Sequence, residues 1–388
     1  MNDKLDLIVI GAGAAGIMSA ITAGRNNKRV LLLEKLPQIA AKLKATGGGR
    51  CNLTNTLSDE DFMSKFGRDG RFMQDVLKLF NHKDLIDFFK NIGVDTHAPD
   101  GFRIFPTSHS SSTIISALQD EMQRLNIDIK CSQKVEEILQ SNGEAKGVRT
   151  STHSFASPNI IVATGGLGYP VLGAEGDGHK FSQDLGHTTT QLHPAMMPLK
   201  TKEDWVANCR ADTIAKVEMR VDMKKHKKLV AHGDLIFTKT GIRGPVVLDF
   251  AREITPLISK YGEVPILMNL TKGLNENQLH QYLKSKSIYT LLPQALADEL
   301  LKLAGEDKSK LLKLLAWTPL TITGHDGFKM AMITRGGIKL NEINPKTMQS
   351  KIIKGLYFCG EVINIDGPCG GYNLQWSFSS GYLAGKLL

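Results

Sequence analysis

The residues best suited to chemistry come first in the chain, in the run Gly11-Ala-Gly-Ala-Ala-Gly16, which a single acid, Glu34, follows 18 residues later. Its G-x-G-x-x-G spacing suits a pyrophosphate. The first glycine allows a tight turn, the second lets the backbone approach the phosphates, and the third lets a helix pack on a strand. An acid at position 34 lies where it can bind ribose hydroxyls and disfavours a 2′-phosphate. FAD or NAD is therefore expected rather than NADP as the tightly held ligand.

The elements around this run are those that the chemistry needs. An apolar strand at 5–10 leads into it, a helical pattern covers 14–26, and a second apolar strand at 30–33 ends at Glu34. The helix start would present unpaired N–H groups and the positive end of its dipole to phosphates. A G-x-G-x-x-G run alone is weak evidence, but one placed between two strands and ending in Glu predicts a Rossmann-type β-α-β unit.

A second glycine run, Thr46-Gly-Gly-Gly-Arg-Cys-Asn52, follows the β-α-β unit. Three consecutive glycines do not suit the interior of a helix or strand, because their backbone entropy is too high, but they permit close approach to a ligand. Arg50, Cys51 and Asn52 add three side chains that can donate hydrogen bonds. We therefore expect a ligand-lining loop rather than a plain surface turn.

The C-terminal part of the chain again contains a strand followed by glycines and a helix. A strand at 355–362 ends in Gly360-Glu361, and Gly370-Gly371 precede a final helix, so that backbone N–H groups again point toward an anionic ligand. The buried-type strand at 159–163 also ends in a glycine turn. One nucleotide fingerprint at the start, completed by elements at the end, indicates a FAD domain interrupted by insertions.

The run Gly-Gly-Gly-Arg-Cys-Asn-Leu-Thr-Asn at 47–55 resembles the signature of a bacterial FAD-dependent flavoprotein family. It comprises BaiN-like and aminoacetone-oxidase-like NAD(P)/FAD-dependent oxidoreductases, including enzymes assigned as ribosomal RNA dihydrouridine synthases. The resemblance extends nearly end to end, with departures at Thr46, Arg243, Pro368 and Cys369. It implies a two-glycine-region flavoprotein with non-covalent FAD, in which NAD(P)H is a transient electron donor. The FAD contacts implied by the fingerprint and the resemblance are Gly11, Gly13, Ala14, Ala15, Gly16, Glu34, Lys35, Lys42, Thr46, Gly47, Gly48, Arg50, Cys51, Asn52, Val135, Ala163, Thr164, Gly165, Gly166, Gly360, Glu361, Asp366, Gly371, Tyr372, Asn373, Leu374 and Gln375.

Changes in pattern divide the α/β chain into a Rossmann-type FAD domain and insertions. The FAD domain is expected at 1–188 and 335–388, and a β-rich insertion at 189–274 and 319–334, itself interrupted by a helical insertion at 275–318. Within the first part, Ser112 is expected to cap a helix that runs to about Leu125. The cluster Lys224-Lys-His-Lys-Lys228 is either a solvated turn or a contact to phosphates.

Bulk composition limits the class of protein. The chain has 388 residues, 41% hydrophobic, and a net charge of +9, which permits an anionic partner such as RNA. Five cysteines without C-x-x-C spacing indicate reduced thiols and no metal site. No apolar run is long enough for a bilayer, and the first strand leaves no room for a signal peptide. We expect a cytoplasmic protein without a membrane segment.

Three functions remain open. The favoured one is NAD(P)H-driven reduction of an activated C=C bond, with uridine in 23S ribosomal RNA as the substrate. The alternatives are an oxidoreductase acting on a small molecule, such as an amine oxidase or a bile-acid-type enone reductase, and a non-catalytic flavin-binding protein associated with RNA. Reduction of uracil needs a proton donor, for which Cys51 and Tyr372 are the candidate catalytic residues, with water as the alternative.

Overall fold

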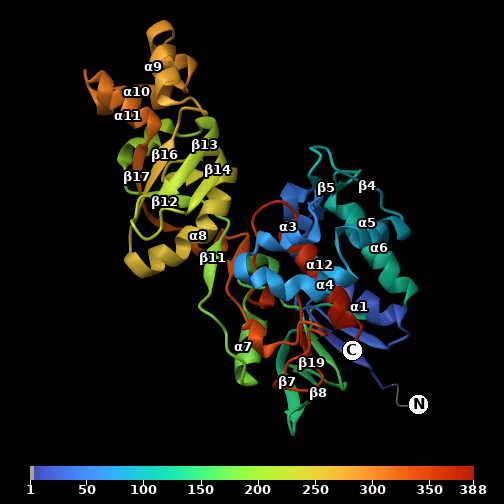
Figure 1. The fold of residues 1–388 in the computed structure, drawn as a ribbon. Coiled ribbons are helices and arrows are strands. Elements are labelled where there is room, and N and C mark those ends of the chain that lie inside the picture. Colours follow the sequence, from blue (N-terminus) through green and yellow to red (C-terminus); the bar gives the residue numbers. More distant parts are fainter. Residues whose placement is uncertain (1–3) are drawn as a thin grey trace. The chain divides into compact units, whose positions relative to one another are not determined.

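The structure is a computed structural model that describes residues 4–388 and divides into two compact units (Figure 1). Unit 1 contains the chain up to Leu192 together with 333–388, and unit 2 contains 193–332. The predicted domain changes, after residue 188 and before residue 335, lie within a few residues of these divisions. Among the described residues, no helix is both long and apolar enough to cross a membrane.

Unit 1 is built on a five-stranded parallel sheet, which confirms the predicted Rossmann-type α/β fold. Its order is β19-β10-β1-β2-β6, with bounds Leu356–Phe358, Ile160–Val162, Leu7–Ile10, Val30–Leu33 and Asp128–Lys130. All residues of β1, β2, β10 and β19 are buried. Continuous apolar strands of this kind form parallel sheets that are covered on both faces.

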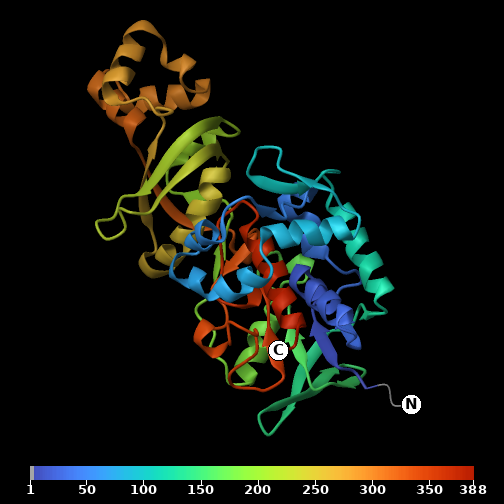
Figure 2. The same ribbon diagram turned by 45° about the vertical axis from the view of Figure 1, so that its right-hand side comes forward.

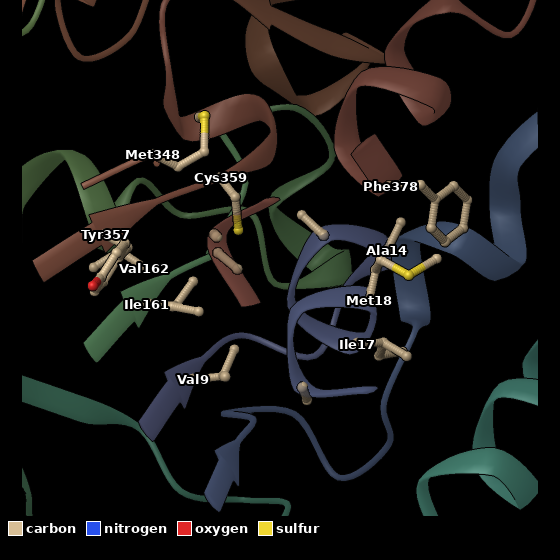
Figure 3. Packing of buried hydrophobic residues seen from close by; sticks show 14 of the residues in the cluster. Val9, Ala14, Ile17, Met18, Ile161, Val162, Met348, Tyr357, Cys359 and Phe378 are labelled. Atoms are coloured by element: carbon tan, nitrogen blue, oxygen red, sulfur yellow. The ribbon is translucent and has the colours of Figure 1, made fainter. Parts of the chain in front are cut away.

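The two ends of the chain meet in the core of unit 1. Helix α1 (Ala14–Arg25) packs along the C-terminal helix α12 (Tyr372–Gly385). Figure 3 shows Phe378 of α12 near Met18 of α1. The indole of Trp376 donates to the Gly360 carbonyl at 3.1 Å, which fixes α12 against the end of β19.

Smaller elements of unit 1 surround the sheet. Helix α2 (Ala41–Ala45) and the 3-10 turn η1 (Thr46–Gly49) precede a small antiparallel sheet, in the order β3-β5-β4. The remaining bounds are β3 Thr54–Asn55, α3 Asp59–Ser64, η2 Gly67–Met73, α4 Gln74–Leu79, α5 His82–Asn91, β4 Thr96–His97, β5 Arg103–Pro106, α6 Ser111–Arg124, β7 Val135–Ser141, β8 Glu144–Thr150, β9 Ser154–Ala156, η3 Pro170–Leu172, α7 Asp177–Asp184, β18 Ile333–Arg335, η7 Leu340–Glu342 and η8 Gly360–Val362. The predicted cap of α6 was wrong by two residues, because the Ser110 side chain, not that of Ser112, accepts the N–H of Ser112.

Unit 2 is a closed six-stranded barrel with helices (Figure 2). The barrel order is β12-β15-β14-β13-β16-β17, with bounds Leu199–Thr201, Gly241–Arg243, Val230–Phe237, Thr213–Val221, Val264–Asn269 and Thr318–His325. Three helices follow β16, at Glu276–Ser285 (α9), Gln294–Ala304 (α10) and Lys308–Ala316 (α11). The other bounds are β11 His193–Ala195, η4 Asp204–Cys209, η5 Ile288–Thr290 and η6 Gly327–Lys329.

The β-rich prediction for 189–274 missed one long helix. Residues Pro245–Tyr261 form α8, with proline in the first turn and Gly262 at the C-cap. Its buried residues, among them Val247, Phe250 and Ile254, recur at helical spacing. The helical period is therefore present in the sequence, although the alternation of the flanking strands masks it.

Candidate cofactor and active site

Four strand ends form the candidate site at the carboxyl edge of the unit 1 sheet. Gly11 follows β1, Glu34 follows β2, Ala163 follows β10, and Gly360 lies shortly after β19. The order of the sheet reverses between β1 and β10, because the chain builds outward from β1 in both directions. Ligands of open α/β sheets bind at such a switch point, and the fingerprint glycines lie at this point of the sheet.

The glycine loop leaves room on the side where a phosphate would approach. A Cβ added to Gly13 would meet no atom within 4 Å, whereas one added to Gly16 would lie 1.9 Å from the Gly11 carbonyl oxygen. Gly13 is also the N-cap of α1 and provides no side-chain cap, so the first N–H groups of the helix keep their capacity for an external acceptor. This combination fits the pyrophosphate of FAD.

Glu34 organises the same loop. Its carboxylate accepts the backbone N–H of Ala12 at 2.8 Å and that of Leu36 at 2.9 Å. Each carboxylate oxygen can accept further bonds, so ribose hydroxyls could bind without displacing either. Lys35 instead pairs with Glu175 at 2.7 Å and with Asp177, which places its ammonium in an ion cluster with acids around the start of α7. Val135, also predicted to contact FAD, is buried at the start of β7.

The second glycine run has the conformation that its sequence requires. Gly47, Gly48 and Gly49 all have positive φ, at 58°, 65° and 87°, which side chains rarely tolerate. Thr46 donates its hydroxyl to the Leu43 carbonyl at 2.7 Å, and Arg50 is exposed. The loop therefore presents backbone and one guanidinium to its surroundings.

This loop is tied to the C-terminal glycine pair. Asn55 donates its amide to the Gly370 carbonyl at 2.9 Å. Asn52, with its amide turned to satisfy both ends, accepts the Gly371 N–H at 3.0 Å. Asn373 bonds both backbone groups of Gly367, at 2.8 and 2.9 Å, and so closes the turn before α12. The structure thus brings together two loops that are more than 300 residues apart.

An ion pair joins α2 to the segment that follows β19. Lys42 on α2 lies 2.7 Å from Glu361, whose other oxygen accepts the Thr334 N–H at 2.7 Å. The Thr334 hydroxyl in turn accepts the N–H of Leu167, just after the turn that holds Thr164, Gly165 and Gly166. Sequence reasoning missed Thr334, because nothing marks a threonine at the end of a short return strand as a partner of Glu361.

Three predicted residues whose side chains could form hydrogen bonds are buried. Cys51 is 0% exposed, Gln375 is 1% exposed and Tyr372 is 4% exposed. Gln375 donates to the Phe80 carbonyl at 3.4 Å and to the Ser379 hydroxyl at 2.8 Å. The Tyr372 ring packs against Phe62 and Phe66, with ring centres 5.1 and 6.0 Å away. Contacts from these three residues would have to come from their backbones.

Burial also changes the chemistry of Cys51. It raises the pKa of the thiol to about 12, against a smaller opposing effect of its hydrogen bond with Thr46. A general acid works best when its pKa lies near the operating pH. The structure therefore favours a packing role for Cys51 over proton donation.

A Cys51→Ala variant should separate these roles. We expect it to retain flavin and turnover and to lose only about 1 kcal/mol of stability, the usual cost of a single substitution. Loss of a general acid would instead slow turnover by ~10²–10⁴-fold. Anaerobic stopped-flow reoxidation of the reduced protein by substrate measures the difference, and a loss of that size would restore Cys51 as the proton donor.

Comparison with known proteins identifies the family of the chain. The HI0933-like protein Rossmann domain family matches residues 5–387. A 3-dehydro-bile acid delta(4,6)-reductase of Clostridium scindens is 31% identical, over 97% of both chains. A ribosomal RNA dihydrouridine synthase of Escherichia coli is 28% identical, over 98% of this chain and 97% of that protein.

Solved structures support the fold alone, because their sequences are distant. An open flavocytochrome c3 fumarate reductase superposes with a TM-score of 0.56 at 18% identity, covering 100% of this chain and 78% of the other. A 3-ketosteroid delta1-dehydrogenase from Sterolibacterium denitrificans gives 0.58 at 10% identity, covering 99% of each chain.

Proposed function

The chain belongs to the HI0933-like family of FAD-dependent oxidoreductases, and from that premise we propose that it reduces an activated C=C bond with electrons from NAD(P)H. The favoured substrate is a uridine of 23S ribosomal RNA. Two full-length relatives are named for the reduction of a bile acid and for the synthesis of dihydrouridine in ribosomal RNA. In both, the double bond is conjugated to a carbonyl group, so the reaction type is shared while the substrate differs.

The chain's own residues would hold the cofactor and shape its surroundings. Bound FAD supplies hydride transfer. Gly13 and the α1 N-terminus would bind its pyrophosphate, and Glu34 its ribose. The Lys42–Glu361 ion pair links α2 to the segment after β19, and Thr334 links Glu361 to the turn after β10. Since Cys51 and Tyr372 are buried, water is our favoured proton source.

The observation that favours RNA is the charge of unit 2. This unit has 21 Lys and Arg against 15 Asp and Glu, so it carries six of the nine net positive charges of the chain. The densest part is the turn between β13 and β14, where Lys224, Lys225, Lys227 and Lys228 are exposed. We call these four residues the lysine tip.

The lysine tip has no internal counterions. Within residues 4–388, none of its ammonium groups has a carboxylate within 4.0 Å, although Asp222 is exposed nearby in the sequence. Three of the described lysines of unit 2 do have carboxylate partners: Lys200 with Asp326, Lys202 with Glu263 and Lys302 with Glu299. Tyr261, 40% exposed, lies beside His226 of the same turn with ring centres 5.9 Å apart. Cations with an exposed aromatic ring suit phosphates and an unstacked base.

Neutralising the lysine tip tests this role. Changing its four lysines to glutamine should leave FAD content unchanged and weaken binding to a 23S rRNA fragment. The slope of log K against log salt should fall by roughly 0.7–0.9 for each phosphate that the variant no longer neutralises. The control variant replaces the paired lysines Lys200, Lys202 and Lys302 and should change the slope much less. Equal slopes in the tip variant and the wild type would make the tip a solvated turn.

The substrate itself is tested in cells. Nucleoside mass spectrometry of ribosomal RNA from a deletion strain should show loss of one dihydrouridine, restored by the wild-type gene. The second candidate, a bile-acid-type enone reductase, has its support in the 31% identical relative. Unchanged dihydrouridine, together with turnover of a conjugated steroid ketone by the purified protein, would favour that alternative.

A further inference from the structure

A cluster of polar side chains beside the glycine run lies on the small sheet of unit 1. Its centre is Phe105 of β5, which is 3% exposed and pairs directly with His97 of β4. The guanidinium carbon of Arg50 lies 5.4 Å from the centre of the Phe105 ring, and the His109 ring centre lies 6.2 Å from it. The rings of His97 and His109 meet edge to face, 4.5 Å apart. We call Arg50, His97 and His109 the Arg50 patch.

Two guanidinium groups lie near Phe105, and among the described residues only that of Arg103 forms an ion pair. Arg103, 5.8 Å from the same ring, pairs with Asp100 at 2.6 Å. Arg50 donates its Nε to the Gly47 carbonyl at 3.3 Å, and no carboxylate among residues 4–388 lies within 4.0 Å of it. Arg50 therefore keeps its terminal N–H groups for an external acceptor, held in place by the ring beneath it.

The surroundings of the Arg50 patch also point to a missing hydrogen-bond partner. The Nε2 atom of His97 is buried and has no hydrogen-bond partner in the described structure, which is rare for a buried polar atom. His109 is exposed, and a Cβ added to Gly48 or Gly49 would meet no atom within 4 Å, so this face of the loop is open. The acids of the same sheet are Asp100, already paired, and the exposed Asp95.

We propose that the Arg50 patch is a phosphate subsite for a ligand that reaches the glycine loop. The planar guanidinium matches phosphate oxygens in a bidentate manner, and the imidazoles add N–H donors. The phosphate could belong to the RNA backbone beside the target base or to the pyridine nucleotide that delivers electrons. The inference rests on the proposed function in that one of these two ligands must visit the loop.

Equilibrium binding to the FAD-loaded protein tests the proposal without turnover. The probes are a fluorescein-labelled 23S rRNA fragment, followed by polarisation, and NADP⁺, followed by calorimetry. If Arg50 serves an external phosphate rather than the FAD contact that the resemblance implies, Arg50→Gln should keep its FAD. It should raise the Kd of one or both probes by about 10–100-fold, the effect of losing a charge-assisted bond. Arg50→Lys should recover only part of the affinity, because an ammonium lacks the fork.

A matched control removes the ion pair between Asp100 and Arg103, whose charges cancel and which also lies near Phe105. The double variant Asp100→Asn/Arg103→Gln keeps the net charge and should bind both probes within about twofold of wild type, since a paired surface charge contributes little. His109→Gln, at an exposed position, should weaken the same probe as Arg50→Gln and serves if the arginine variant does not fold.

The pattern of binding losses either assigns the phosphate subsite to one ligand or overturns it. Weaker RNA binding alone assigns the subsite to the RNA backbone, and weaker NADP⁺ binding alone assigns it to the pyridine nucleotide. Unchanged affinities, loss of FAD from Arg50→Gln, equal losses in the control, or no binding of either probe to the wild type would overturn the proposal. Because binding is measured without reduction, a chain that reduces no uridine can still show the subsite, and one that reduces uridine can lack it.

Discussion

A Glu34→Ala variant is expected to retain its yellow flavin more weakly than the wild type. The carboxylate would bind the ribose hydroxyls of FAD, and in the protein it already accepts the N–H groups of Ala12 and Leu36. A hydrogen bond to a charged acceptor contributes ~1.5–3 kcal/mol, so losing the ribose contacts should raise the Kd for FAD by about 10–100-fold. The unpaired Ala12 N–H should add to this by loosening the glycine loop.

Glu34→Gln provides the matched comparison. Its amide oxygen can still accept one N–H group and one hydroxyl, while its NH₂ group cannot accept at all, so we expect an intermediate affinity. FAD titration of the apoprotein, followed by flavin fluorescence, measures all three proteins. Wild-type affinity in Glu34→Ala would remove the acid from the cofactor site and with it the sequence argument for a ribose contact.

The local parts of the fold could be predicted, because each depends on a few neighbouring residues. The unit Leu7 to Leu33 and the fingerprint glycines carry their own geometry, and the family resemblance extends it to the far end of the chain. The positive φ angles of Gly47–Gly49 agree with the expectation that three consecutive glycines do not suit the interior of a helix or strand.

Long-range contacts could not be predicted in the same way. Thr334 meets Glu361 and Leu167 through the tertiary fold, across 27 and 167 residues. The burial of Cys51 and Tyr372 likewise depends on which segments cover them, and Phe62 and Phe66 of the α3–η2 segment cover Tyr372. Residue type suggested a proton donor at both positions, and the packing now argues for structural roles.

Helix α8, which the sequence analysis missed, illustrates a different limit. The residues Val264 to Asn269 that follow it and the strand Val230–Phe237 before it alternate strongly, so their pattern masks the helical period between them. Pro245 and Gly262 mark the start and end of that helix in the sequence. Punctuating residues were thus better evidence than the average character of the segment.

The second and third glycines of the fingerprint should respond oppositely to the same added methyl group. Gly13→Ala places its Cβ in open space and has a φ of −84°, which alanine adopts freely, so the apoprotein should fold with nearly wild-type stability. Gly16→Ala places its Cβ 1.9 Å from the Gly11 carbonyl oxygen, between α1 and β1. That overlap requires the backbone to move and should cost about 1–3 kcal/mol or more.

Gly13→Ala, which should leave the stability of the apoprotein nearly unchanged, should instead weaken flavin binding. If the pyrophosphate lies against that glycine, the methyl group in Gly13→Ala should raise the Kd for FAD by roughly 10–100-fold while the apoprotein Tm stays near that of wild type. In Gly16→Ala the apoprotein Tm itself should fall, by roughly 2–4 °C for each kcal/mol lost. Circular dichroism melting of both apoproteins, paired with FAD titration, separates the effects. A Gly13→Ala protein that binds FAD as tightly as wild type would show that the phosphates lie elsewhere, because no atom among residues 4–388 occupies the space into which that methyl group projects.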